Sequence, residues 1–198
     1  MSQDGVNKAR RTLLVGATAG VGAVGAGFLA VPFVKSWMPS EKAKAAGAPA
    51  KVDISKVEPG AMLTAEWRGK PVYVVRRTEE TLKTLETLAD RLKDPENSNK
   101  EQQPGYADNL YRSRKPEVLI LLGVCTHLGC APKYFPEVKP EPFDPKWQGG
   151  WFCPCHGSRF DLSGRVFNGS PASANLVVPP YSYESDSVVI VGVDEENA

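Results

Sequence analysis

Two short boxes of cysteine and histidine are the residues of this chain best suited to chemistry. The first reads Cys125-Thr126-His127-Leu128-Gly129-Cys130, and the second reads Cys153-Pro154-Cys155-His156-Gly157-Ser158. All 4 cysteines and both histidines of the chain lie between Cys125 and His156. Cysteine and histidine at such short spacing indicate a metal site, and zinc is the first metal to consider. A zinc site would need only four of the six side chains, and it would leave the surplus cysteines, Cys130 and Cys155, unexplained.

The two boxes resemble, position by position, those of the Rieske iron-sulfur family. In that family the first cysteine and the histidine of each box hold a 2Fe-2S cluster, and the remaining cysteines form a disulfide bond. The resemblance implies one cluster per chain, with these ligands for its two irons: Cys125 and Cys153 for one, His127 and His156 for the other. It also implies a disulfide bond between Cys130 and Cys155, which an oxidising compartment would permit.

The resemblance further implies electron transfer. Two neutral imidazoles in place of two thiolates make an electron easier to add, and Rieske clusters accordingly lie at roughly −150 to +300 mV. Quinol oxidation releases an electron and a proton together, so an exposed ligand histidine is a suitable acceptor. We therefore take His156 as the catalytic residue that would meet a quinol. By the same resemblance Ser158 would hydrogen-bond a bridging sulfide and Leu128 would shield the cluster from water.

Two positions depart from the family pattern. The segment Ser170-Pro171-Ala172-Ser173 stands where relatives carry a proline-containing loop over the cluster, commonly worded Gly-Pro-Ala-Pro. Phe160 stands where high-potential relatives often have a tyrosine whose hydroxyl bonds a ligand cysteine. Phenylalanine has no hydroxyl to donate, so we expect a lower midpoint potential than a Phe160→Tyr variant would have.

An apolar segment near the amino terminus predicts a membrane anchor. Residues 13–34 contain no charge, and as a helix they would span about 33 Å, enough for a hydrocarbon core of about 30 Å. Lys8, Arg10 and Arg11 precede the segment, which favours a cytoplasmic amino terminus. The Arg10-Arg11 pair resembles a twin-arginine export signal, a route that carries folded proteins with their cofactors. The apolar run exceeds that of a cleaved secretory signal, so we expect the anchor to be retained.

The rest of the chain predicts a tether and one domain. We expect residues 1–12 to form the cytoplasmic amino terminus, 13–34 the anchor, 35–51 a flexible tether and 52–198 the domain, with a cluster-binding subdomain at about 124–173. Short segments with strand character predict a mainly antiparallel β domain; they are Ala61–Trp67, Pro71–Arg77, Val118–Val124, Asn175–Val178 and Ser187–Val193. A helix capped by Thr78 and extending to Lys93 would face the core with Leu82, Leu85, Leu88 and Leu92. The polar residues 94–116 read as a surface excursion.

Composition and layout narrow the function. The net charge of +1 gives no indication of nucleic acid binding. The order of anchor, tether, β domain and cluster loops resembles the iron-sulfur subunits of bacterial cytochrome bc1 complexes. That resemblance implies cytochrome b and cytochrome c1 as partners in a dimeric complex of the inner membrane, with the domain on the periplasmic side. The alternatives are a Rieske subunit of another exported oxidoreductase, such as arsenite oxidase, and a zinc-stabilised interaction module.

Overall fold

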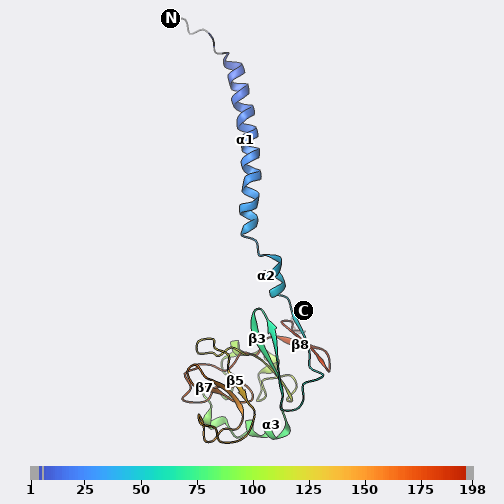
Figure 1. Ribbon diagram of the computed structural model, residues 1–198, viewed down its shortest axis with the longest axis vertical. Helices are drawn as coiled ribbons and strands as arrows, with labels where there is room; N and C mark the ends of the chain where they lie inside the picture. Colours follow the sequence, from blue (N-terminus) through green and yellow to red (C-terminus); the bar gives the residue numbers. More distant parts are fainter. Residues whose placement is uncertain (1–4, 6, 195–198) are drawn as a thin grey trace. The chain divides into compact units, whose positions relative to one another are not determined.

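The computed structural model describes residue 5 and residues 7–194 and divides the chain between Ala45 and Ala46 into two compact units (Figure 1). Its helices and strands follow one another in this order: α1 (Lys8–Ser36), α2 (Glu41–Ala46), β1 (Ala50–Asp53), β2 (Met62–Trp67), β3 (Lys70–Arg76), α3 (Glu79–Leu85), β4 (Val118–Leu122), β5 (Lys133–Phe135), β6 (Gly150–Cys153), β7 (Ser158–Phe160), β8 (Tyr181–Ser185) and β9 (Val188–Val191). Single 3-10 turns cover Ala89–Arg91, Lys100–Gln102 and Gly105–Ala107.

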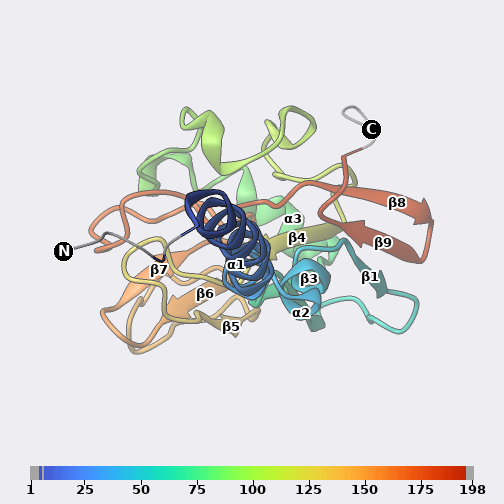
Figure 2. The same ribbon diagram turned by 90° about the horizontal axis from the view of Figure 1, so that it is seen from above.

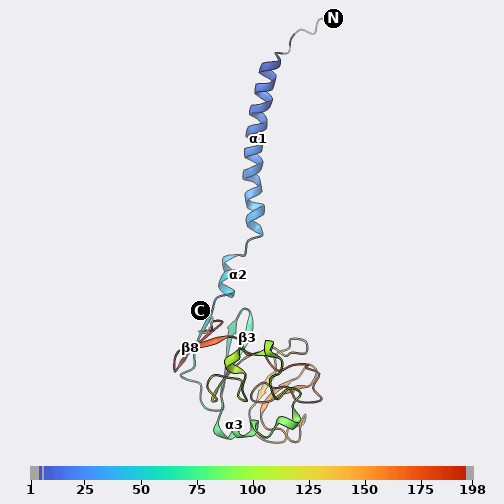
Figure 3. The same cartoon turned by 180° about the vertical axis from the view of Figure 1, so that it is seen from behind.

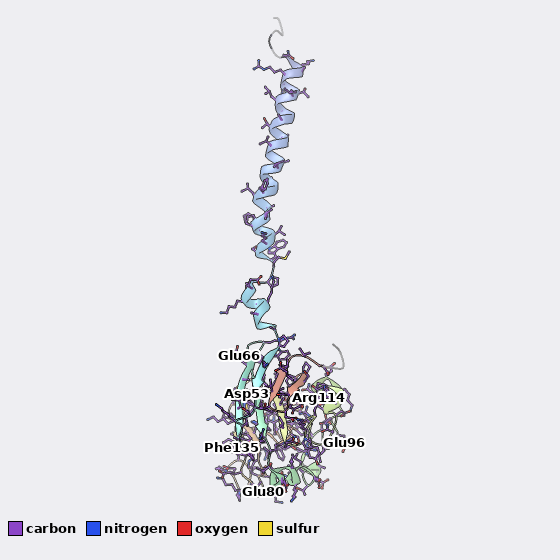
Figure 4. The ribbon with its side chains drawn as sticks, turned by 90° about the vertical axis from the view of Figure 1, so that its right-hand side faces the viewer. Asp53, Glu66, Glu80, Glu96, Arg114 and Phe135 are labelled. Atoms are coloured by element: carbon purple, nitrogen blue, oxygen red, sulfur yellow. A yellow bond between two sulfur atoms is a disulfide. The ribbon has the colours of Figure 1, made fainter. Side chains whose placement is uncertain are left out.

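Helix α1 contains the predicted anchor and extends beyond it at both ends. It begins after Asn7, whose side chain accepts a hydrogen bond of 3.2 Å from the amide of Arg10. None of its residues is buried, and its side chains project around the whole helix (Figure 4). By length and composition α1 can cross a membrane, so the predicted transmembrane helix has its structural counterpart.

The second unit is built from three sheets of three strands, and all of their strand pairs are antiparallel. The strand orders are β1-β9-β8, β2-β3-β4 and β5-β6-β7. Viewed from above, β3 and β4 lie between the group β5 to β7 on one side and the group β1, β8 and β9 on the other (Figure 2). The fold is therefore the predicted antiparallel β domain with one short helix, and α3 lies at the end of this domain away from β8 (Figure 3).

A continuous apolar core joins the sheets. Strand β4 is buried at every position, which matches its uninterrupted apolar sequence VLILL. It pairs with β3, where Val72 lies opposite Leu122 and Val74 lies opposite Ile120. The predicted strands at β2, β3, β4 and β9 are thus confirmed, with shifts of at most two residues at their ends.

The predicted helix from Thr78 to Lys93 is too long. Thr78 does cap it, because its hydroxyl accepts the amide of Thr81, but the helix ends at Leu85. Leu85 belongs to the main core, whereas Leu88 and Leu92 pack in a second cluster with Trp147 and Phe167. A straight helix cannot direct one leucine stripe into two separate cores, so the chain turns after Leu85.

Two further expectations are wrong. Residues 94–116 are not a surface excursion, since Asn97, Gln103 and Arg112 are buried there. The buried Arg112 donates hydrogen bonds to the carbonyl of Ser163 and to the side chain of Gln103, at 3.1 and 3.0 Å. Residues 175–178 do not form a strand, because their backbone bonds go to three different segments, at Gly164, Leu122 and Gln102.

Several strands had no counterpart in the prediction. Strand β1 starts at Ala50, inside the segment expected to be a tether, and β8 was not predicted at all. The short hairpin strands β5, β6 and β7 were also missed, although they carry the second cysteine-histidine box. Each has only three or four residues, too few to show an alternating pattern.

Candidate metal centre

The first box is a tight loop that follows strand β4. The amide of Cys125 donates to the carbonyl of Cys130 at 2.8 Å, and the amide of Gly129 donates back to the carbonyl of Cys125 at 2.9 Å. Gly129 has a φ of 84°, a backbone conformation that favours glycine. These bonds turn the chain sharply, and they leave Cys125 buried while Leu128 is 70 % exposed at the tip.

The second box is the turn of the hairpin formed by β6 and β7. The amide of Gly157 donates to the carbonyl of Cys153 at 2.9 Å, as Gly129 does in the first box. Cys153 pairs with Ser158 across the two strands, so both side chains lie on the same face of the hairpin. Phe160 shares this face, whereas Phe152 and Arg159 lie on the other.

The four cysteines fall into two pairs. Cys130 and Cys155 form a disulfide bond that joins the two loops. Cys125 and Cys153 carry free thiols and are buried. Burial raises the pKa of the Cys153 thiol, and the neighbouring thiol of Cys125 raises it further. The sulfur atoms of Cys130, Cys153 and Cys155 lie within 4.8 Å of one another, but the two in the disulfide have no thiolate to offer a metal.

The histidines of the two boxes are in contact with each other. The rings of His127 and His156 lie edge to face, with centroids 4.8 Å apart. The Nδ1 atom of His127 is buried and has no hydrogen-bond partner among the described residues. His156 is exposed. The structure therefore places the Cys125 and Cys153 thiols next to each other and the two imidazole rings against each other, and one of these rings has an unpaired buried nitrogen.

The loop of residues 170–173 is bound to the second box. The buried hydroxyl oxygen of Ser158 accepts a hydrogen bond of 3.0 Å from the amide of Ala172. The hydroxyl of Ser170 accepts a bond of 3.0 Å from the amide of Arg159. This loop is therefore attached directly to β7, beside Cys153.

Two residues that support these loops, Tyr73 and Lys93, were not predicted from the sequence. Tyr73 of β3 donates a hydrogen bond from its hydroxyl to the carbonyl of Pro132, just beyond the first box. Its ring covers Gly123, where an added Cβ would lie 2.4 Å from the ring. Lys93 donates to two carbonyls of the loop of residues 170–173. These contacts join residues that are distant in the sequence, so no local pattern predicts them. The only local indication of a close contact is the single glycine between β4 and the first box.

An aromatic cluster supports the far side of the hairpin. Phe143 stacks on Phe152 with centroids 4.1 Å apart, and it contacts Phe135 (labelled in Figure 4) and Trp147 edge to face. On the same face of β7, the side chain of Arg159 bonds the carboxylate of Asp144 at 3.1 Å. The hairpin thus has packed side chains behind it and the thiols in front.

Family models match two parts of the chain. The model described as the ubiquitinol-cytochrome C reductase Fe-S subunit TAT signal matches residues 1–40. The model described as the Rieske [2Fe-2S] domain matches residues 91–182. The second match contains both boxes and the loop of residues 170–173.

Similar proteins match over nearly the whole chain. The ubiquinol-cytochrome c reductase iron-sulfur subunit of Allochromatium vinosum is 54% identical over 198 residues, 100% of this chain and 95% of that protein. The subunit of the same name from Blastochloris viridis is 40% identical, over 96% of this chain and 97% of that protein. A solved structure titled "Hyperthermophilic respiratory Complex III" contains a chain that is 27% identical, with a TM-score of 0.48, over 89% of this chain and 98% of that one.

Proposed function

The chain belongs to the family of ubiquinol-cytochrome c reductase iron-sulfur subunits, and we propose that its [2Fe-2S] cluster is held by the free cysteines and the histidines of the two boxes: Cys125, Cys153, His127 and His156. The donor set fits such a cluster, since it offers two thiolates for one iron and two imidazoles for the other. The remaining cysteines, Cys130 and Cys155, are already joined to each other and tie the two ligand loops together.

The observation that carries this proposal is the buried Nδ1 atom of His127. It has no hydrogen-bond partner among the described residues, and it lies in a loop whose cysteine thiol is also buried. An unpaired buried polar atom costs about 1–3 kcal/mol, and iron coordination would remove that cost. The edge-to-face packing of His127 and His156 keeps the two imidazole rings together.

When bound, the cluster supplies a one-electron carrier with a higher potential than an all-cysteine cluster has. The residues of the chain set the conditions for that transfer. The ring of His156 is exposed and therefore available to a partner, and we propose that it contacts the quinol. The ring nitrogen of His156 that does not bind iron would hold the proton released by the quinol. With the cluster bound, Leu128 and the loop of residues 170–173 would limit the access of water, and the hydroxyl of Ser158 would be able to donate a hydrogen bond to the cluster.

The partners that we propose are those that membership of this family suggests. We propose that the chain takes an electron from ubiquinol at a cytochrome b and passes it to a cytochrome c1, as a subunit of a ubiquinol–cytochrome c reductase. The relatives whose names carry that activity match this chain over nearly its full length, which favours this reading over a subunit of arsenite oxidase or a similar enzyme. The disulfide bond disfavours a zinc module, because it gives Cys130 and Cys155 a role that a zinc site would leave unexplained.

The anchor and its flanking residues support a location at the bacterial inner membrane. The apolar helix α1 lies within the match to an export signal. We propose that residues 13–34 remain as the anchor, residues 35–51 act as the tether, and the domain 52–198, with its cluster-binding part at about 124–173, lies in the periplasm. Protease added to intact inner-membrane spheroplasts should then digest the domain without lysis, whereas a cytoplasmic domain would be protected.

Low-temperature EPR of ascorbate-reduced membranes tests the function. The experiment compares membranes with and without an inhibitor that occupies the quinol site of cytochrome b. We expect the rhombic spectrum of a histidine-ligated 2Fe-2S cluster, and we expect the inhibitor to shift it. A cluster spectrum indifferent to the inhibitor would favour another oxidoreductase, and metal-loaded protein with no spectrum would favour zinc.

A further inference from the structure

The side chain of Lys93 is hydrogen-bonded to the backbone of the loop of residues 170–173. Its ammonium donates hydrogen bonds of 2.6 Å to the carbonyl of Ser170 and 2.8 Å to the carbonyl of Ala172. Hydrogen bonds from a charged donor are shorter and stronger than those between neutral groups. Two such bonds from one side chain fix the two carbonyls on either side of Pro171 relative to each other.

The backbone around Lys93 holds this side chain in place. The amide of Lys93 donates to the carbonyl of Val166 at 2.9 Å, and the amide of Asn168 donates to the carbonyl of Arg91 at 2.8 Å. On the other side, the Asn175 side chain donates to the carbonyl of Asp94 at 3.1 Å. Residues 91–94 are therefore hydrogen-bonded to the segments just before and just after the loop, and this places the side chain of Lys93 at the middle of the loop.

The loop in turn fixes a hydroxyl group beside Cys153. The amide of Ala172 donates to the hydroxyl oxygen of Ser158, which is fully buried. Because this oxygen accepts from Ala172, the proton of the Ser158 hydroxyl must point elsewhere, and it makes no hydrogen bond within residues 7–194. Ser158 lies opposite Cys153 across the hairpin, so its proton is free to donate toward the centre formed by the two boxes.

We propose that Lys93 is a positioning residue that holds Ala172 against Ser158 and so orients the Ser158 hydroxyl. The loop Ser170–Ser173 contains one proline, whereas the common Gly-Pro-Ala-Pro wording contains two. The hydrogen bonds from Lys93, a residue outside the segment of the two boxes, restrain the loop backbone in place of the second proline. The inference deepens the proposed function, and it rests on that function only for its redox consequence. Without Lys93 the Ser158 proton is less well directed, so the reduced state of the centre loses stabilisation and the midpoint potential falls.

Hydrogen exchange of the cluster-loaded full-length protein in detergent tests the first step. Mass spectrometry of the peptide that contains Ala172 reports the amide bonded to Ser158. In Lys93→Met, which keeps the backbone bonds and the length of the apolar stem of the side chain, we expect exchange in this peptide to be about tenfold faster, because two charge-assisted bonds are lost. Lys93→Arg keeps a charged donor and should retain most of the protection. Lys133→Met, an exposed lysine on β5, serves as the matched control and should leave this peptide unchanged.

The midpoint potential tests the second step. We expect Lys93→Met to lower it, Lys93→Arg to restore most of it, and Lys133→Met to change it less than Lys93→Met does. Unchanged exchange in Lys93→Met would overturn the proposal, and so would equal shifts of potential in Lys93→Met and Lys133→Met, since loss of charge alone would then explain the effect. Failure of the proposed function is separate: it would appear as a wild-type protein without the EPR spectrum of a histidine-ligated cluster.

Discussion

The hydroxyl of Tyr73 donates a hydrogen bond of 3.0 Å to the carbonyl oxygen of Pro132. The ring of the same tyrosine covers Gly123, with so little space that a Cβ there would lie 2.4 Å from it. Gly123 precedes the first box and Pro132 follows it. One side chain of the central sheet therefore braces the first ligand loop at both ends.

Replacement of Tyr73 by phenylalanine tests this brace. The ring would still cover Gly123, but the buried carbonyl of Pro132 would lose its donor, which costs about 1–3 kcal/mol. We expect the free energy of unfolding, measured by urea titration with tryptophan fluorescence, to fall by about that amount. Tyr134→Phe is the control, because its hydroxyl bond to Gly60 is longer, 3.2 Å, and only partly buried. An equal or smaller loss in Tyr73→Phe would contradict the brace.

Phe160 offers a direct test of how the hairpin sets the potential. Its side chain is fully buried on the face of β7 that it shares with Cys153 and Ser158. A hydroxyl added there by Phe160→Tyr should reach a ligand sulfur and stabilise the reduced state. A hydrogen bond of about 1 kcal/mol corresponds to about 40 mV for a one-electron couple, so we expect the midpoint potential to rise by tens of millivolts.

Phe152→Tyr provides the matched control for this prediction. Phe152 lies on the opposite face of the hairpin and stacks on Phe143, so its hydroxyl would point away from the thiols. The control should leave the potential measured by redox titration unchanged. If Phe160→Tyr left the potential unchanged or lowered it, the assigned role of this position would be wrong.

Features of this site that depend on residues close together in the sequence could be predicted, whereas features that depend on contacts between distant residues could not. The six side chains of the two boxes were visible because their spacing is local, and their division into ligands and disulfide came from resemblance to a family. The positions at which the helix after Thr78 ends and the leucines separate were not predictable. Leu88 and Leu92 are drawn into a cluster with Trp147 and Phe167, more than fifty residues away in the sequence.

Buried polar side chains were the second source of error. Arg112 lies in a polar stretch that reads as exposed, yet it is fully buried and bonded to Ser163 and Gln103. Arg114 (labelled in Figure 4) likewise bonds the carbonyl of Tyr181 at 3.2 Å and the carboxylate of Asp194 at 2.9 Å. Such contacts pair a donor with an acceptor from another part of the chain, which composition does not specify.

The disulfide between Cys130 and Cys155 should contribute to stability by constraining the unfolded chain. The two residues are 25 positions apart, and closure of a loop of that length corresponds to about 3.5 kcal/mol. We expect the double variant Cys130→Ala, Cys155→Ala to lose about that free energy of unfolding, as measured by urea titration. Cys155 is exposed, so treatment of the wild-type protein with a thiol reductant should reproduce the loss. A reductant without effect on either stability or thiol count would show that the bond is not accessible.

The raised pKa of Tyr181 predicts how the stability of the domain changes at alkaline pH. Burial raises the pKa of its phenol to about 12, although the amide of Arg114, which donates to the hydroxyl at 2.8 Å, lowers it. Burial raises the pKa of Tyr134 to about 12 as well. A raised pKa means that the folded state holds the phenol proton more tightly than the unfolded state. The stabilisation is therefore complete below the ordinary value of about 10 and is lost as the pH rises toward 12, by about 2–3 kcal/mol for each such tyrosine.

Titration of tyrosinate absorbance measures this directly. Of the 6 tyrosines, we expect some to ionise late, near pH 12, and Tyr181→Phe should remove one equivalent from that late step. In concentrated urea all tyrosines should titrate near pH 10, because the burial that separates the two steps is gone. If Tyr181→Phe instead removed its equivalent from the early step, the phenol would have to be accessible to water in the folded domain. Its hydroxyl could not then be the fixed acceptor for Arg114 that joins the loop before β4 to β8.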